Sequence, residues 1–426
     1  MACRSCWKSS RPPAKPEEPQ SREDNTMKIS RRTLGLSATA LSLPSLVQAQ
    51  PATIKLGFTA ALTGPFNEFG EGINRGAQIA VEECNKAGGI NGRMVALAEV
   101  LDDQLVPDRA VQNLRRILDN REIVGLMCPS GSGPTLAIAD MIQADGRPII
   151  NPQAQTPAIV YPNGLDKPPR PNLFSVSISN TVESEKLGAA LSQFSRVGIV
   201  HESTGYGVTG AELVRQELVK RQPGLRVTVE SYNQRAQDMT AQLVRVQRAN
   251  AEAMLVIGLG ADFAVIRRNM SRLNMNLALF GAAGAVTMPY IEGAGDLVAG
   301  TRAVNHAAFG RRPMHGAAAK FVDLYRAKFG TDRWYGQDAA NPLISLAATV
   351  GSGYDCINLL IDAIRRAGST NAAEIVQALD QTRDFEGATI QKISFTPQNH
   401  VALKLEDLGT YEMLKRGDRV VLELRD

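Results

Sequence analysis

The 426-residue sequence has few cysteines, few histidines, few aromatic residues and little net charge. Two of its five cysteines lie in an N-terminal segment that we exclude from the fold, which leaves the odd set Cys84, Cys128 and Cys356. An odd set does not imply a disulfide framework. The four histidines are scattered at His201, His306, His315 and His400. Because no Cys/His pair has the spacing of metal ligands, the sequence predicts no metal site, and nothing in it requires a cofactor.

An excess of charge of one sign is also lacking. The net charge at neutral pH is +4, but residues 1–49 contain eight basic and four acidic side chains, and the rest of the chain has 39 of each. A nucleic-acid-binding protein needs positive charge gathered on one surface, and no run of Lys or Arg supplies it. We therefore expect no nucleic-acid partner.

The N-terminus has the features of an export signal. Ser30-Arg31-Arg32-Thr33-Leu34 opens a moderately apolar stretch that ends in the small-residue cleavage pattern Val47-Gln48-Ala49. The stretch is shorter and more polar than the roughly 20 apolar residues of a membrane-spanning helix. We predict a twin-arginine signal that is removed after Ala49 and directs the protein to the periplasm. Met27 is the natural initiator, with residues 1–26 as an extension outside the fold, although a start at Met1 stays open.

From Thr53 onward, strand-like runs alternate with helical periodicities, the pattern of βαβ units around a parallel sheet. Ile54, Leu56 and Phe58 alternate as in a strand, and the apolar residues between Ile73 and Cys84 recur at helical spacing. Further strands are predicted at 94–100, 122–127, 147–150, 197–201, 225–230, 253–258, 277–281 and 297–304. Helices are predicted to begin at Pro107, Pro134, Gly207 and Asp262, with another around Leu243.

A proline-rich stretch, 151–172, interrupts this alternation and indicates a second lobe. The chain is also longer than one hydrophobic core usually supports. We predict an α/β fold of two doubly wound parallel-sheet lobes with a cleft between them. Ligands of such sheets lie beyond the carboxyl ends of the strands, so the loops after strands are expected to contain the site.

Three of these loops contain hydrogen-bonding groups. The loop 128–134 reads Cys-Pro-Ser-Gly-Ser-Gly-Pro and precedes a predicted helix. Its hydroxyls and the helix N-terminus can bind an anion, although an ordinary turn between a strand and a helix is the more common explanation of such a loop. It is not a phosphate-binding P-loop, because no Lys-Ser/Thr follows. The other two loops are 151–157 and 202–207.

The order of these loops and of several short motifs resembles the branched-chain amino-acid-binding protein family, which has the type I periplasmic binding fold. The motifs span nearly the whole mature chain: Leu62-Thr63-Gly64-Pro65, Phe69-Gly70, Gly76-Ala77, Gly88-Gly89-Ile90-Asn91-Gly92, Asp102-Asp103, Pro148-Ile149-Ile150, Tyr206-Gly207, 363–368 and Asp384-Phe385-Glu386-Gly387. The resemblance implies two lobes that close by hinge movement, joined by crossovers near 174–177, 304–306 and 394–396. The implied lobes are 50–175 with 306–395, and 176–305 with 396–426.

The resemblance also implies which residues hold the ligand. In the family, the Ser-rich loop and the loop after it bind the ligand's carboxylate, and an aromatic residue of the second lobe covers it. The matching positions are Ser130, Gly131, Ser132, Ala154, Gln155, Thr156 and Tyr206, with Phe69 lining the cleft. A protein of this kind delivers its small-molecule ligand to an ABC-type permease in the inner membrane, and we expect it to be a monomer.

Departures from the family pattern bear on the choice of ligand. Gln155 precedes Thr156 where amino-acid-binding members have Thr or Ser, and 281–284 reads Gly-Ala-Ala-Gly where they have a carboxylate for the ligand's ammonium. A buried ammonium without a counter-charge costs several kcal/mol. The sequence therefore favours a carboxylate without an amine, an aromatic or short aliphatic acid, with room for a ring beside Ala283. Asp262 is the alternative amine partner, although a helix N-cap is its more ordinary role. Branched-chain amino acids and amides stay alternative ligands.

The resemblance implies that the family's disulfide is lost, because Cys128 matches one partner while Leu105 stands near the place of the other. We expect Cys128 to be a free thiol. An enzyme is the main alternative from another class, but the chain lacks a G-x-S-x-G nucleophile motif and a G-x-G-x-x-G after its first strand. We therefore expect that the protein is not an enzyme. Presentation of the ligand to a membrane sensor stays an alternative to transport.

Overall fold

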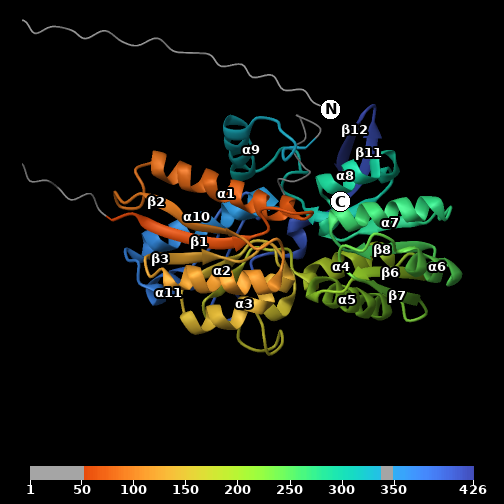
Figure 1. Cartoon of the computed structure of the whole chain (residues 1–426), viewed down its shortest axis with the longest axis horizontal. Coiled ribbons are helices and arrows are strands. Elements are labelled where there is room, and N and C mark those ends of the chain that lie inside the picture. Colours follow the sequence, from red (N-terminus) through yellow and green to blue (C-terminus); the bar gives the residue numbers. More distant parts are fainter. Residues whose placement is uncertain (1–51, 337–348) are drawn as a thin grey trace, which may run out of the picture. The chain divides into compact units, whose positions relative to one another are not determined.

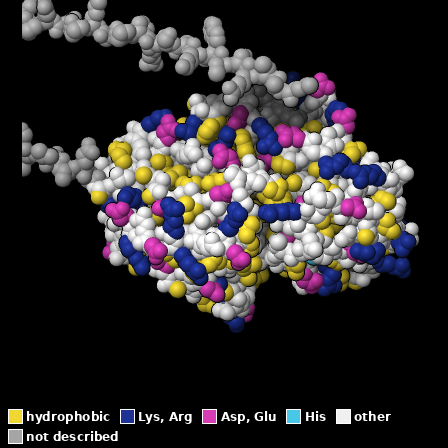
Figure 2. Space-filling model, viewed as in Figure 1, with side chains coloured by type: hydrophobic (Ala, Val, Ile, Leu, Met, Phe, Trp, Pro, Cys, Tyr) yellow, Lys and Arg dark blue, Asp and Glu magenta, His cyan; other side chains and the backbone are white. Residues whose placement is uncertain are grey.

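The computed structural model describes residues 52–336 and 349–426, and strands and helices alternate along most of this length (Figure 1). The predicted signal and its cleavage site lie outside the described residues. Within the described ranges, no helix is both long and apolar enough to cross a bilayer. On the face shown in Figure 2, basic and acidic side chains are interspersed.

The first lobe contains a five-stranded sheet of strand order β2-β1-β3-β4-β5, and all its paired strands are parallel. Its strands are β1 (Ile54–Ala60), β2 (Val95–Asp102), β3 (Ile123–Met127), β4 (Ile149–Asn151) and β5 (Leu173–Ser175). Its helices are α1 (Asn67–Lys86), α2 (Pro107–Asp119), α3 (Ser132–Asp145), α9 (Gly316–Phe329), α10 (Gly351–Ala367) and α11 (Ala372–Asp380). Helix α1 packs with α10, and α2 packs with α3 on the opposite side of the strands (Figure 1).

The second lobe contains a seven-stranded sheet of strand order β12-β11-β10-β9-β8-β6-β7. Its strands are β6 (Arg196–Glu202), β7 (Arg226–Tyr232), β8 (Ala253–Ile257), β9 (Ala278–Gly281), β10 (Arg302–His306), β11 (Leu408–Arg416) and β12 (Arg419–Leu424). Its helices are α4 (Asn180–Leu191), α5 (Gly205–Arg221), α6 (Thr240–Arg248), α7 (Gly260–Arg272) and α8 (Met288–Ala294). Strand β11 pairs antiparallel with both β10 and β12, so the parallel sheet has an antiparallel edge.

Local sequence explains most of these elements. Strand β1 is buried along almost all of its length, as expected for a strand covered by helices on both faces. Helix α1 buries Ile73, Ala77 and Cys84 on one face and ends before Gly88 and Gly89, which both have positive φ. The structure corrects one predicted strand: within 297–304, a 3₁₀ helix covers Gly295–Val298, and β10 begins only at Arg302. Strands β11 and β12 were not predicted.

The chain passes between the two sheets three times. The first pass follows β5 and the second follows β10, near the predicted crossovers. For the third pass, predicted near 394–396, the N–H of Phe395 donates to the carbonyl oxygen of Thr382, and Val401 pairs with Ser175. The first and third passes therefore lie side by side. The residue bounds given above for the lobes stay a prediction.

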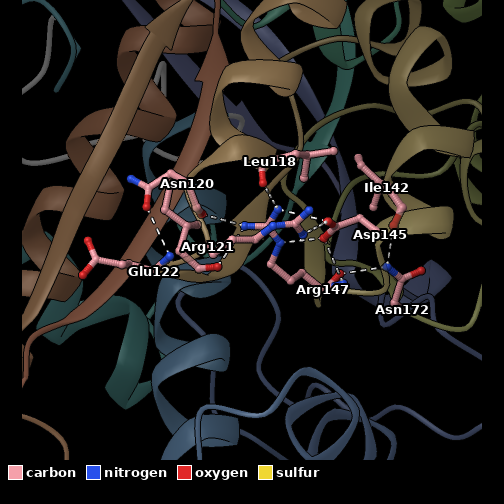
Figure 3. Close-up of polar contacts among 9 residues, drawn as sticks. Leu118, Asn120, Arg121, Glu122, Ile142, Asp145, Arg147 and Asn172 are labelled. Carbon is pink, nitrogen blue, oxygen red and sulfur yellow. Dashed lines mark hydrogen bonds and ion pairs between the residues drawn. The ribbon is translucent and has the colours of Figure 1, made fainter.

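A buried arginine joins several elements at the amino ends of β3 and β4 (Figure 3). The guanidinium of Arg147 donates hydrogen bonds to the carbonyl oxygens of Leu118 (3.0 Å), Asn120 (3.1 Å) and Ile123 (3.0 Å), and it pairs with the Asp145 carboxylate. Only 8% of Arg147 is exposed. Its charge and its donors are satisfied by the end of α2, the start of β3 and the end of α3.

The three remaining cysteines are free thiols. Within the described residues, Cys84, Cys128 and Cys356 are buried and free, as expected for Cys128. Burial in apolar surroundings raises the pKa of each thiol, so the thiolate is disfavoured. These cysteines contribute to packing.

Candidate functional site

Loops at the carboxyl ends of strands from both sheets line one cavity of about 120 Å³. This volume is below the roughly 300–1,000 Å³ of pockets for drug-sized ligands, so the cavity suits a compact molecule. Seven of the ten predicted site residues line it: Phe69, Ser130, Gly131, Ser132, Gln155, Tyr206 and Ala283. Ala154, Thr156 and Asp262 are absent from its lining.

The first-lobe wall is built from the loop between β3 and α3. The Ser130 hydroxyl oxygen accepts the N–H of Ala61 (3.2 Å), and the Ser132 hydroxyl oxygen accepts the N–H groups of Gln155 (3.0 Å) and Thr156 (3.3 Å). Each hydroxyl still has its own hydrogen to donate. Helix α3 begins at Ser132, so the first amides of the helix and its positive dipole end also belong to this wall. This wall offers hydrogen-bond donors to an anion.

Gly131 allows this loop to approach the neighbouring one. A Cβ atom at Gly131 would lie 2.6 Å from Cδ1 of Leu105, closer than carbon atoms normally approach. Leu105 itself lines the cavity and packs in a small apolar cluster with Phe66 and Phe69. A larger residue at position 131 would therefore move the wall.

The second predicted loop divides between two cavities. Gln155 lines the main cavity, but Ala154 and Thr156 line a separate cavity of about 310 Å³, which Gln155 also borders. The Thr156 hydroxyl is buried and has no hydrogen-bond partner among the described residues. Asn151 and Ser132 bind the backbone of Ala154 and Thr156, but neither of these two residues lines the main cavity.

The second-lobe wall contains Tyr206 and Glu202. Tyr206 is 6% exposed, and its hydroxyl lies near the backbone amide of Gly284 without forming a hydrogen bond of normal geometry. Burial and the nearby Glu183 carboxyl raise its pKa, so the phenol is neutral. The Glu202 carboxylate accepts the N–H of Thr204 (2.6 Å), the hydroxyl of Thr204 (2.6 Å) and the N–H of Gly207 (2.8 Å). Glu202 therefore holds the start of α5 and lines the cavity at the same time.

His306 closes the cavity at the end of β10. Only 2% of it is exposed, and its Nδ1 has no hydrogen-bond partner among the residues that the structure describes. Burial lowers its pKa to about 3, so the imidazole is neutral at physiological pH. No role in the site was predicted for His306 from the sequence. The position of His306 at a strand end beside a crossover was the signal that points to the cleft.

The carboxylate of Asp262 binds a backbone N–H group of the protein, whereas from the sequence it was considered as the partner of a ligand's ammonium group. It lies in the first turn of α7, is 3% exposed, and accepts the N–H of Arg235 with both carboxylate oxygens at 3.2 Å. The residue before the helix is Leu259, so Asp262 is also not the N-cap. Desolvation by burial raises the pKa of Asp262 to about 6.

The loop after β9 is supported by a carboxyl group from another element. Ala283 and Gly284 line the cavity, and the N–H of Ala283 donates to Oε1 of Glu183 at 2.7 Å. Glu183 belongs to α4 and is 2% exposed, and burial raises its pKa to about 7. The loop has no carboxylate of its own, as the sequence indicated, but the structure brings one behind it.

The chain is similar to curated proteins whose names refer to amino-acid binding. It is 25% identical over 344 residues to Leu/Ile/Val-binding protein homolog 3 of Brucella melitensis, which covers 79% of this chain and 86% of that protein. It is 24% identical over 378 residues to the leucine-, isoleucine-, valine-, threonine-, and alanine-binding protein of Pseudomonas aeruginosa, with coverage of 86% and 91%.

Solved structures share the fold. A periplasmic binding protein type 1 from Bordetella pertussis Tohama I is 48% identical, with a TM-score of 0.85, and the match covers 88% of this chain and 100% of that one. The branched-chain amino acid transporter substrate binding protein LivJ from Streptococcus pneumoniae, solved in complex with isoleucine, has a TM-score of 0.72 at 22% identity, with coverage of 88% and 99%. The family model described as periplasmic binding protein matches residues 53–405. With two wound lobes around one cavity and a family match over most of its length, the chain belongs to the periplasmic binding proteins and has the type I fold of the branched-chain amino-acid-binding proteins.

Proposed function

We propose that the protein captures a small organic carboxylate in the interlobe cavity and delivers it to an ABC-type permease in the inner membrane. The observation that carries this proposal is the first-lobe wall, where two serine hydroxyls and the N-terminus of α3 offer donors to one small volume. Donors in this arrangement bind an anion without a Lys or Arg. The described lining residues include neither of these two types.

The preferred ligand has no amine. The loop after β9 faces the cavity with Ala283 and Gly284, and Asp262 is engaged by the backbone of Arg235. Glu202 already accepts three of the about four hydrogen bonds that a carboxylate can take. Little acceptor capacity is left for the three donors of an ammonium, which supports an aromatic or short aliphatic acid.

A zwitterionic amino acid is the second candidate, and one observation favours it. Glu202 is a charged residue in the wall opposite the serine loop, so an ammonium there would have a counter-charge, as the binding of branched-chain amino acids requires. Amides stay a further possibility, because Gln155 and the neutral His306 border the same volume.

Export and assembly form part of the proposal. The arginine pair at Arg31-Arg32 supports export through a twin-arginine pathway with cleavage after Ala49, and the mature protein acts as a monomer. Presentation of the ligand to a membrane sensor would use the same cavity, so the identity of the membrane partner is a separate question from the identity of the ligand.

Calorimetric titration of the mature protein, recovered from the periplasm, separates these ligands. Benzoate, a short aliphatic acid, leucine and its amide form a sufficient panel. Tight binding of an acid and none of leucine supports the amine-free ligand. Tight binding of leucine with no response to either acid rejects it and assigns the ammonium to Glu202, and binding of the amide alone rejects the carboxylate proposal altogether. The N-terminal residue of the recovered protein, read by mass spectrometry, checks the cleavage site.

A further inference from the structure

One arginine of the second lobe reaches across the cleft. Arg235 lies between β7 and α6, and its Nη2 donates a hydrogen bond of 2.8 Å to the carbonyl oxygen of Gln104 in the first lobe. Its guanidinium carbon also lies 5.3 Å from the ring centre of Phe66, which precedes α1. The sequence neighbours Gln234 and Leu105 both line the cavity. The contact therefore lies at the rim of the site.

Both ends of this contact have unusual backbone conformations. Arg235 has a φ of 69°, and Gln104 and Leu105 have φ values of 52° and 60°. Residues other than glycine adopt this left-handed region at an energetic cost, so the surrounding structure must stabilise it. Left-handed residues therefore stand at both ends of this contact between the lobes.

Carboxylates stabilise each of these conformations. Asp262 accepts the N–H of Arg235, Asp102 accepts the N–H of Gln104 at 3.0 Å, and Asp103 accepts the N–H of Leu105 at 2.8 Å. Asp103 is fully buried and also accepts the hydroxyl hydrogen of Thr59. Each lobe therefore contributes a prearranged half of the contact, and the two halves meet in this structure.

We propose that Arg235, Gln104 and Phe66 form an interlobe latch, in which Arg235 is a positioning residue that favours the closed arrangement of the lobes even before ligand binds. The side chain of Arg235 is exposed, so it contributes little to the core of its own lobe. A charged donor on a carbonyl and a cation over an aromatic ring add favourable energy only in the closed form. The latch rests on the interlobe binding function proposed above, and it does not depend on which ligand the cavity takes.

Single-molecule energy transfer between the lobes tests this latch without any ligand. Dyes attached to Gln112→Cys on α2 and Gln216→Cys on α5 report the distance between the lobes, because both positions are exposed and the three cysteines of the described chain are buried. Arg235→Met removes the charge and the donors and keeps the aliphatic stem. Arg248→Met, an exposed arginine of α6 in the same lobe, is the matched control. Arg235→Lys keeps the charge but loses the planar guanidinium.

The expected order of closed fractions is wild type and Arg248→Met first, then Arg235→Lys, then Arg235→Met, with roughly a fivefold fall in the closed-to-open ratio for the last variant. The thermal unfolding temperature should be nearly unchanged in all of these variants. A lower unfolding temperature of Arg235→Met alone would indicate a merely structural role of Arg235 instead. A different order of closed fractions, including equality of Arg235→Met and wild type, overturns the latch. Because no ligand is present, this result is independent of the binding panel.

Discussion

Two polar regions, one at each end of the first-lobe sheet, differ in whether a charged side chain gathers their hydrogen bonds. At the amino ends of β3 and β4, Arg147 is paired with Asp145 and with three carbonyl oxygens. At the carboxyl ends of these strands, the cavity contains a tyrosine hydroxyl and a histidine nitrogen that lack protein partners among the described residues. The Oδ1 atom of Asn172, beside Arg147, also has no partner among the described residues, so an unsatisfied polar atom does not by itself mark a ligand site; the cavity is distinguished by the open volume that its unsatisfied groups border.

Breaking the Arg147 cluster should have the largest effect on stability. Arg147→Met leaves Asp145 and three carbonyl groups without their buried partner, which should lower the free energy of unfolding by about 3–5 kcal/mol. Arg121→Met removes an exposed arginine beside the same carboxylate and should cost less than about 1 kcal/mol. Urea unfolding measures both. Ligand affinity of the folded fraction should be unchanged, and similar losses for the two variants would contradict the comparison.

Glu183 should make stability depend on pH, because its carboxyl group is buried behind the cavity loop. Its pKa is about 7 in the folded protein and near 4.5 when unfolded. Below pH 4.5 the carboxyl is protonated in both states, but as pH rises toward 7 only the unfolded chain releases the proton, so stability falls by roughly 3 kcal/mol. Glu183→Gln lacks this titration. Urea unfolding at pH 4.5 and at pH 8 measures this difference. From the lower to the higher pH, the stability of Glu183→Gln should rise relative to that of wild type. Parallel pH profiles of the two proteins would reject the assignment.

Replacing Ser132 should lower ligand affinity in addition to the stability that its hydrogen bonds to two amides provide. Ser132→Ala removes the acceptor of two amides and a donor to the ligand, so affinity for the tightest ligand of the panel should fall at least tenfold, or about 1.4 kcal/mol. Ser195→Ala, at an exposed site before β6, should leave affinity unchanged. Calorimetry measures both dissociation constants. Equal affinities for wild type and Ser132→Ala would place the ligand elsewhere.

Tyr206 should show the smallest effect on stability. Tyr206→Phe removes a buried hydroxyl that has no protein partner, so the free energy of unfolding should change by less than about 0.5 kcal/mol. Tyr290→Phe removes a buried hydroxyl that bonds to Thr301 at 2.7 Å and should cost about 1 kcal/mol. Thermal unfolding without ligand compares the two. A larger loss for Tyr206→Phe would mean that its hydroxyl is already satisfied inside the protein.

Much of the fold and part of the site followed from local patterns. Apolar periodicity predicted the βαβ units, since burial on one helix face or along a covered strand follows directly from residue spacing. The glycine pair at Gly88-Gly89 predicted the end of α1. The Ser-rich loop was found because a strand followed by small residues and a helix start is visible in the sequence. Strands β11 and β12 were missed because they extend the second sheet by antiparallel pairing after a long return of the chain.

The sequence by itself determined the wound α/β lobes, the Ser-rich loop and the absence of a carboxylate in the loop after β9, because each of these depends on neighbouring residues alone. Only the tertiary structure decided that Asp262 holds Arg235, that Glu202 and His306 line the cavity, and that Glu183 lies behind its wall. These groups come from elements far apart in the chain, and their distances, burial and pKa values arise only when the two lobes are folded and face each other.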